Sequence, residues 1–223
     1  MNMLKAIHRW FRSLTKTPVA PADTIEQTPT PSLPLGLAAG KHIEFDDALR
    51  LLLDGQSYVP LPTMETIWSH GTLDLGQHTV LHRFYMNDDD YWLQVLVQDG
   101  EASDIILFSY DECITITNEV ELKRLVGLDS DIGLPDYVYN ECEFIRQWGS
   151  EPGQTELTPM LEQVTTPDAQ YHVRHLSMLY ARDTGLTERR EFLLFSVEED
   201  DEGVISLSTS LGVTLKPSDL RIT

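Results

Sequence analysis

The side chains of this sequence whose types and spacing could support chemistry are mainly histidines. His78 and His82 are four residues apart, and His172 and His175 are three apart. On a strand the first pair shares a face but is separated by about 13 Å, at about 3.3 Å per residue, and the second pair points to opposite faces. Neither pair could chelate a metal by itself. We therefore interpret these histidines as surface or hydrogen-bonded side chains.

The segment Asp129-Ser130-Asp131-Ile132-Gly133 has carboxylates at alternate positions, as calcium loops do. An EF-hand loop that began at Asp129 would need glycine at position 134 and a bidentate glutamate at position 140. The chain has Leu134 and Asn140 at these positions. The sequence therefore predicts no metal and no cofactor.

Cys113 and Cys142 lie in or beside apolar segments, and we interpret both as free, buried residues in a reducing compartment. The chain contains no G-x-x-x-x-G-K-[ST] phosphate loop, no G-x-G-x-x-G, no G-x-S-x-G and no H-E-x-x-H. No catalytic residue is predicted. Whether the protein is an enzyme stays open at this point, with a preference for a non-catalytic role.

The charge and composition limit the classes of partner. The 223 residues include 36 acidic and 16 basic ones, and the formal net charge is -20. A surface this acidic is repelled by phosphate backbones, so no nucleic-acid partner is predicted. The hydrophobic fraction of 41% is sufficient for a core, and no apolar run approaches the roughly 18 residues of a spanning helix.

Residues 1–17 form a basic segment that contains no acid, while the remaining residues carry a charge of -24. At about 100° per residue, the apolar side chains of this segment fall on one helical stripe and the basic ones on the opposite side. This pattern is typical of an amphipathic helix in a membrane interface. The residues predicted to bind a membrane or a partner are Leu4, Lys5, Ile7, Arg9, Trp10, Phe11, Arg12, Leu14 and Lys16.

Other readings of this segment remain open. It could be a mitochondrial transit peptide, a helix that docks on the protein's own body or on a partner protein, or a frayed tail. Residues 18–39 read as a linker rich in proline and threonine. Its prolines favour an extended chain with a reach on the order of 50 Å, which would keep the acidic body several Debye lengths from an anionic surface.

Residues 40–223 read as an acidic, β-rich globular domain of the α+β class, dominated by antiparallel sheet. Helices are expected at 45–55 and 119–126, the second capped by Asn118 and stopped by Gly127. Strands are expected at residues 78–86, 91–98, 104–110, 113–117, 142–148 and 157–164.

The later half of this domain also reads as a repeat of an earlier β-meander, with lobes at 40–135 and 136–223. At a constant offset of 99, residues 91–97 align with 190–196, 105–107 with 204–206 and 114–116 with 213–215. Two unrelated sets of antiparallel strands with acidic turns could match equally well.

Several segments of this domain resemble the YjfK-like family of bacterial proteins of unknown function. They are Asp131-Ile132-Gly133-Leu134-Pro135, Arg189-Arg190-Glu191-Phe192-Leu193-Leu194, and the pair Gly203-Val204-Ile205-Ser206 and Gly212-Val213-Thr214-Leu215. The resemblance covers about residues 40–223. It implies a bacterial cytoplasmic protein whose relatives are often encoded beside a membrane-remodelling protein and an ATP-grasp ligase, and it supplies no catalytic residue.

These observations favour a non-catalytic accessory or adaptor protein. The N-terminal helix would tether it to an anionic membrane surface or to a membrane-associated protein, in the cytoplasm or peripherally on the inner membrane, in a bacterial envelope-stress role. One alternative is an enzyme or enzyme subunit acting on a cationic, polyamine-type ligand, because an acidic body concentrates cations. The other is a regulatory protein-binding module.

Overall fold

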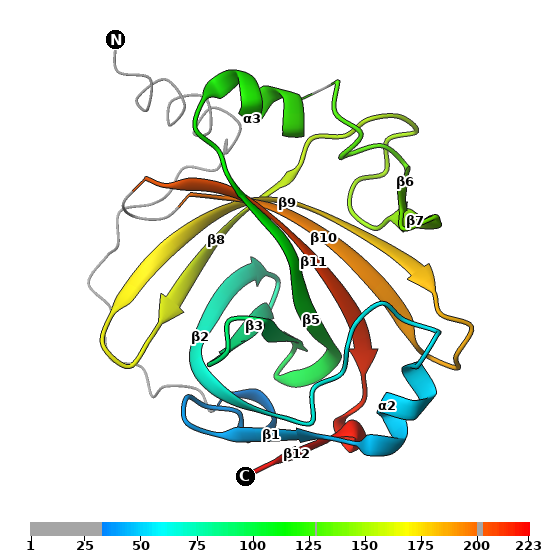
Figure 1. Cartoon of the computed structure of the whole chain (residues 1–223). Coiled ribbons are helices and arrows are strands. Elements are labelled where there is room, and N and C mark those ends of the chain that lie inside the picture. The colour runs from blue at the N-terminus through cyan, green and yellow to red at the C-terminus, as the bar shows by residue number, and fades with distance from the viewer. Residues whose placement is uncertain (1–32, 128, 200–202) are drawn as a thin grey trace.

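Eight antiparallel strands close into a barrel in the computed structural model, which describes residues 33–127, 129–199 and 203–223 (Figure 1). Around the barrel the order is β2-β3-β4-β5-β11-β10-β9-β8, and the pairing of β8 with β2 closes the ring. The strands are β2 (Met64–Gly76), β3 (Thr79–Met86), β4 (Tyr91–Gln98), β5 (Glu101–Thr115), β8 (Thr158–Thr165), β9 (Gln170–Asp183), β10 (Arg190–Glu199) and β11 (Ile205–Leu215).

Four short strands extend the sheet beyond the barrel. β1 (His42–Phe45) pairs with the start of β2 and with β12 (Leu220–Ile222), and β7 (Cys142–Arg146) pairs with the end of β9 and with β6 (Asp136–Tyr139). The helices are α2 (Asp47–Leu53), α3 (Glu119–Val126) and two 3-10 turns, η1 (Pro34–Gly36) and η2 (Pro217–Asp219). In Figure 1, α3 and the β6–β7 hairpin lie above the arch of β9–β11, whereas β1, β12 and α2 lie below it.

The predicted α+β class is wrong. The described residues contain only two α-helices, and both are short attachments to a closed antiparallel barrel. The physical reason is that the sheet curls until its first strand meets its last, so its inner face is buried by other strands. Helices are therefore not needed to cover that face.

The barrel consists of two four-stranded meanders, but the alignment predicted from the sequence does not match their side-chain faces throughout. β2–β5 and β8–β11 are each a four-stranded antiparallel meander. The offset of 99 aligns Leu93, which belongs to the large core outside the barrel, with Phe192, which belongs to the cluster inside it. These two side chains therefore face opposite sides of the sheet and do not correspond, although Ile116 and Leu215, at the same offset, lie in one cluster.

The outer faces of β3–β5 and β9–β11 carry the main hydrophobic core. Leu93, Val95, Leu107, Leu193 and Val213 are fully buried there. They form one cluster with side chains of β1, α2, α3 and β7: Ile43, Phe45, Leu49, Leu53, Leu122, Val126 and Phe144. Six barrel strands are thus apolar on their outer face because the attached elements cover them.

Both helix predictions are confirmed, together with the Asn118 cap, whose side chain accepts a hydrogen bond from the Glu121 amide. β2 was not predicted. β5 was predicted as two strands, but it runs unbroken from Glu101 to Thr115. No helix among the described residues is long and apolar enough to cross a membrane.

Candidate ligand-binding cavity inside the barrel

A cavity of about 1070 Å³ lies inside the barrel. Inward-facing side chains from seven of the eight barrel strands line it, and only the interior of a closed barrel can bring such residues together. They are Leu73, Leu81, Gln94, Leu96, Asp104, Ile106, Met160, Leu179, Arg190 and Phe192.

Strand alternation places these residues. On β4, Gln94 and Leu96 face the cavity, whereas Leu93 and Val95 lie in the outer core. The same period of two holds on β5 and β10, where Ile106 and Phe192 face inward and their neighbours Leu107 and Leu193 face outward. The lining is mostly aliphatic and aromatic, and a few polar groups lie among these residues.

An aromatic stack packs against residues that line the cavity. The Trp92 and Phe108 rings lie nearly parallel, at 8°, with their centroids 4.2 Å apart, and the Arg83 guanidinium carbon lies 4.9 Å from the Trp92 ring centroid. Trp92 and Phe108 form one buried cluster with Ile106 and Phe192, which line the cavity. Arg83 is also the direct strand partner of Gln94, which lines the cavity, so the polar part of the interior begins beside the cavity.

Glu162 is the centre of that polar part and is fully buried. It accepts hydrogen bonds from Arg83 Nη1 at 2.9 Å and from the Tyr85 hydroxyl at 2.7 Å. His175 Nε2 lies 2.8 Å from Glu162 Oε2, and His175 Nδ1 lies 3.6 Å from Glu198 Oε1. Side chains of β3, β8, β9 and β10 thus meet across the barrel in one ionic cluster.

Gly71 makes room for this cluster. A Cβ atom at Gly71 would lie 1.6 Å from Glu162 Oε1. Because Gly71 lies on β2, between β3 and β8, its missing side chain allows Arg83 of β3 and Glu162 of β8 to meet over it.

The cluster holds its acids ionised. Burial alone would raise the pKa of Glu162, but the charge of Arg83 and the donors His175 and Tyr85 lower it to about 2. Burial would lower the pKa of His175, but hydrogen bonds to Glu162 and Glu198 raise it. Burial also raises the pKa of Tyr85 far above its ordinary value, so its hydroxyl stays a donor.

Three buried donors of Arg83 and Trp92, both neighbours of the lining residue Gln94, have no hydrogen-bond partner among the described residues. They are Nε and Nη2 of Arg83 and Nε1 of Trp92. Both side chains are only 3% exposed. A buried donor without an acceptor costs roughly 1–3 kcal/mol, so these groups mark a place where an acceptor would be favoured.

The outer end of the cavity is more polar. Arg190 Nη2 donates to Gln147 Oε1 at 2.7 Å, and Gln147, Trp148 and Gly149 line the cavity where the chain leaves β7. Arg190 and Asp104 are both exposed. Charged side chains therefore lie at the solvent end and apolar ones deeper in.

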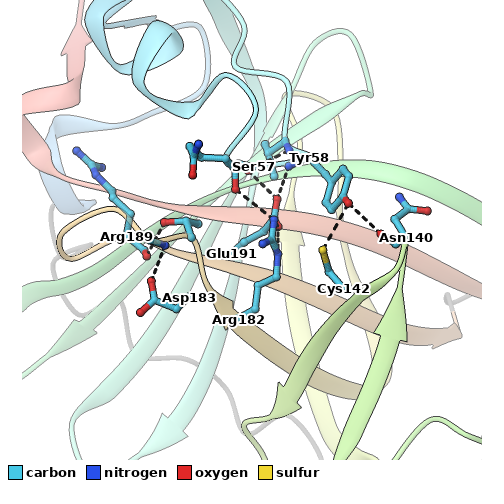
Figure 2. Close-up of polar contacts among 12 residues, drawn as sticks. Ser57, Tyr58, Asn140, Cys142, Arg182, Asp183, Arg189 and Glu191 are labelled. Carbon is cyan, nitrogen blue, oxygen red and sulfur yellow. Dashed lines mark hydrogen bonds and ion pairs between the residues drawn. The ribbon is translucent and has the colours of Figure 1, made fainter.

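A second buried acid, Glu191, lies on the outer face of β10 (Figure 2). Its carboxylate accepts from the Ser57 hydroxyl at 2.7 Å, from the Tyr58 amide at 2.5 Å and from Arg182 Nε at 2.5 Å. The Tyr58 hydroxyl donates to the Asn140 carbonyl and lies 3.5 Å from Cys142 Sγ. This network fastens the loop after α2 to β9, β10 and the β6–β7 turn, so we assign it a structural role.

The structure places the candidates from the sequence as follows. His78 lies in the β2–β3 turn with a φ of 59°, so the prediction that it shares a strand face with His82 is wrong. His172 is exposed and His175 is buried inside the barrel, as opposite faces require. Cys113 is exposed and Cys142 half-buried, so the prediction that both are buried is wrong.

The Asp129–Gly133 segment packs against the barrel. The Tyr180 hydroxyl accepts a hydrogen bond from the Gly133 amide at 2.7 Å, and Arg146 donates to the Gly133 carbonyl at 2.5 Å. Across the described ranges no group of three His, Cys, Asp or Glu side chains is placed to hold a metal. The predicted membrane- or partner-binding residues, Leu4 to Lys16, lie outside the described residues.

Sequence reasoning singled out His175 but missed the other interior residues of the cluster and the cavity. One signal was available on β11, where Ser206, Ser208, Ser210 and Gly212 alternate with Leu207, Leu211 and Val213. The serines and Gly212 face the barrel interior, where small side chains fit a crowded space, and the apolar residues face the outer core. By contrast, Arg83 and Glu162 are 79 residues apart, and no local pattern pairs them.

Comparison with known proteins gives a family but no function. The family model described as Protein of unknown function (DUF2491) matches residues 8–221, so the chain belongs to this family. Searches of curated proteins and of solved structures found no match.

Proposed function

We propose that this member of the DUF2491 family is a non-catalytic binding protein that holds one largely apolar small molecule inside its barrel. The observation that carries the proposal is the cavity of about 1070 Å³, lined by inward-facing residues of seven strands. An eight-stranded barrel is wide enough to enclose a small ligand. Ligand sites are typically apolar concave spaces of about 300–1,000 Å³ with a few polar groups.

The lining favours a ligand without strong net charge. Leu73, Leu81, Ile106, Leu179 and Phe192 are all at least nine-tenths buried and would supply apolar contact around the ligand. The charged residues that line the cavity, Asp74, Asp104, Arg174 and Arg190, balance one another. This balance gives no reason to prefer a cationic ligand of the polyamine type, so we do not carry that alternative further.

No reaction forms part of the proposal. Glu162 and His175, the buried groups that could transfer a proton, do not line the cavity, and they contact each other. Glu162 also accepts hydrogen bonds from Arg83 and Tyr85, and His175 shares one with Ser196. A ligand in the cavity meets aliphatic and aromatic side chains first. Storage, transport or sensing of a small molecule is the role that suits such a site.

The test is binding of N-phenyl-1-naphthylamine, a neutral apolar fluorophore, to the full-length protein. We expect saturable binding at one site. Leu96→Trp adds bulk from the cavity wall and should weaken binding by roughly tenfold or more, about 1.4 kcal/mol. Val138→Trp is the matched control, because Val138 is 66% exposed on β6, away from the barrel.

Both variants are first checked for an unchanged unfolding midpoint. Equal probe affinity in the wild type and the Leu96→Trp variant would place the probe elsewhere and refute the cavity site. Absence of saturable binding by the wild type would refute it as well.

The membrane-tethered accessory role stays a second part of the proposal. Its support is the sequence of residues 1–17, with apolar and basic side chains on opposite sides of a helix. The YjfK-like resemblance is consistent with that role. A barrel that binds apolar molecules would be well placed at a membrane surface, where such molecules are concentrated.

A further inference from the structure

We infer that the ligand carries a neutral hydrogen-bond acceptor, such as an ester, carbonyl or hydroxyl oxygen, at its inner end, where Arg83 and Trp92 receive it. This inference rests on the proposed function and specifies the chemical class of the ligand. Its basis is a set of buried donors on side chains next to Gln94, which lines the cavity.

The donors belong to two side chains in contact. Arg83 Nη1 is bonded to Glu162, but Arg83 Nε, Arg83 Nη2 and Trp92 Nε1 have no hydrogen-bond partner in the described part of the chain. The Arg83 guanidinium lies over the Trp92 ring, so the unused donors are close together. A native interior rarely leaves three adjacent donors unsatisfied.

Strand register places these donors next to the cavity. Gln94 lines the cavity, Arg83 is its direct partner on β3, and Trp92 precedes it by two residues on the same face of β4. Directly opposite side chains lie about 4.5–5.5 Å apart at Cβ, and next neighbours on one strand are also within reach of long side chains. A ligand that fills the cavity as far as Gln94 would bring its end atoms to Arg83 and Trp92.

The charges around the donors select a neutral acceptor over an anion. Glu162 already neutralises Arg83, and Glu198 faces His175 in the same cluster. A ligand carboxylate would add an unpaired negative charge in a desolvated interior that has no excess of positive charge. A neutral oxygen would accept the free N–H groups without that penalty.

The test compares three competitors of equal chain length: a medium-chain alkane, the corresponding methyl ester and the corresponding carboxylate. Each displaces N-phenyl-1-naphthylamine from full-length protein at neutral pH. We expect the ester to bind roughly tenfold tighter than either of the others, since one or two hydrogen bonds contribute about 1–1.5 kcal/mol.

Trp92→Phe removes the indole N–H and keeps an aromatic ring against Phe108. It should lower ester affinity several-fold and leave alkane affinity unchanged. Trp68→Phe is the matched control, because Trp68 is 42% exposed and has no cavity contact.

The outcomes are separable. Equal affinity of all three competitors, or tightest binding of the carboxylate, overturns this inference and leaves the cavity proposal standing. Loss of alkane and ester affinity together in Trp92→Phe also overturns it, because the indole N–H would then have no specific role. Failure of the fluorophore itself to bind refutes the underlying cavity function.

Discussion

Glu65 is an acidic residue that ionises near neutral pH. It is partly buried at the start of β2, and burial, Asp88 and Asp90 together raise its pKa to about 7 from an ordinary value of 4.5. The folded protein therefore holds a proton here that the unfolded chain has already lost between about pH 4.5 and 7. Stability from this site is present at low pH and decreases as the pH rises through that window.

We predict that Glu65→Gln, which mimics the protonated acid, raises the free energy of unfolding at pH 8 and has little effect below pH 4.5. The gain should be on the order of 1 kcal/mol, because solvent screens a partly exposed group. Urea unfolding at several pH values measures it. Glu101→Gln, at the exposed start of β5, is the control; an equal gain at both sites would point to net charge alone.

At this scale the sequence shows residue types but not partners. In the sequence, Gly71 resembles any glycine that weakens a strand. In the structure, the Glu162 carboxylate occupies the space that a side chain at position 71 would fill. His175 was recognised as a candidate, but its neighbours Glu162 and Arg83 come from strands that only barrel closure brings together. Local spacing carries no information about contacts of this kind.

Among the elements, the loop between α2 and β2 depends most on a single buried acid. Glu191 accepts hydrogen bonds from Ser57, Tyr58 and Arg182, and Arg182 stacks on the Tyr58 ring at 5.4 Å (Figure 2). This arrangement anchors a segment that otherwise has little secondary structure.

We predict that Glu191→Ala destabilises the protein by about 3 kcal/mol or more, because it leaves Arg182 without its buried partner. Amide hydrogen exchange should accelerate at residues 54–63. The control is Glu44→Ala, whose ion pair with Arg221 is exposed and should contribute less than about 1 kcal/mol. Unchanged exchange at 54–63 would contradict the anchoring role.

The elements that could be predicted from the sequence are those with local signals. α2 and α3 have polar caps, Asp46 and Asn118, and a short apolar face, so they were found. β2 was missed because Gly71 lies within it, Gly76 ends it, and the burial of its residues varies along its length. β5 was divided because exposed acids, Asp111 and Glu112, resemble a turn although the strand continues through them.

At the scale of the whole molecule, closure of the barrel was the feature that no local pattern contained. It depends on the contact of β8 with β2, residues 163–165 with 70–72. This contact creates the cavity, and it also makes the two meanders into one body. Sequence alone predicted two sets of antiparallel strands and left their relation open.

The proposed membrane tether, residues 1–17, concerns the whole molecule because it would set where the barrel lies in the cell. Binding of the full-length chain to anionic vesicles tests it. Wild type should co-sediment with them, less so at high salt, because four bases attract anionic lipid at about 1 kcal/mol each and salt screens that attraction. The double variant Leu4→Glu, Phe11→Glu should stay in solution, since both residues lie on the apolar stripe.

The variant Asn2→Glu, Ser13→Glu supplies the matched control, because it adds the same two charges on the polar side of the predicted helix. If apolar burial holds the segment in the interface, the stripe variant loses far more binding than this control. Equal losses would mean that net charge alone governs the attraction. A wild-type chain that never sediments with vesicles would remove the membrane tether, and the barrel would then have to meet its ligand in solution.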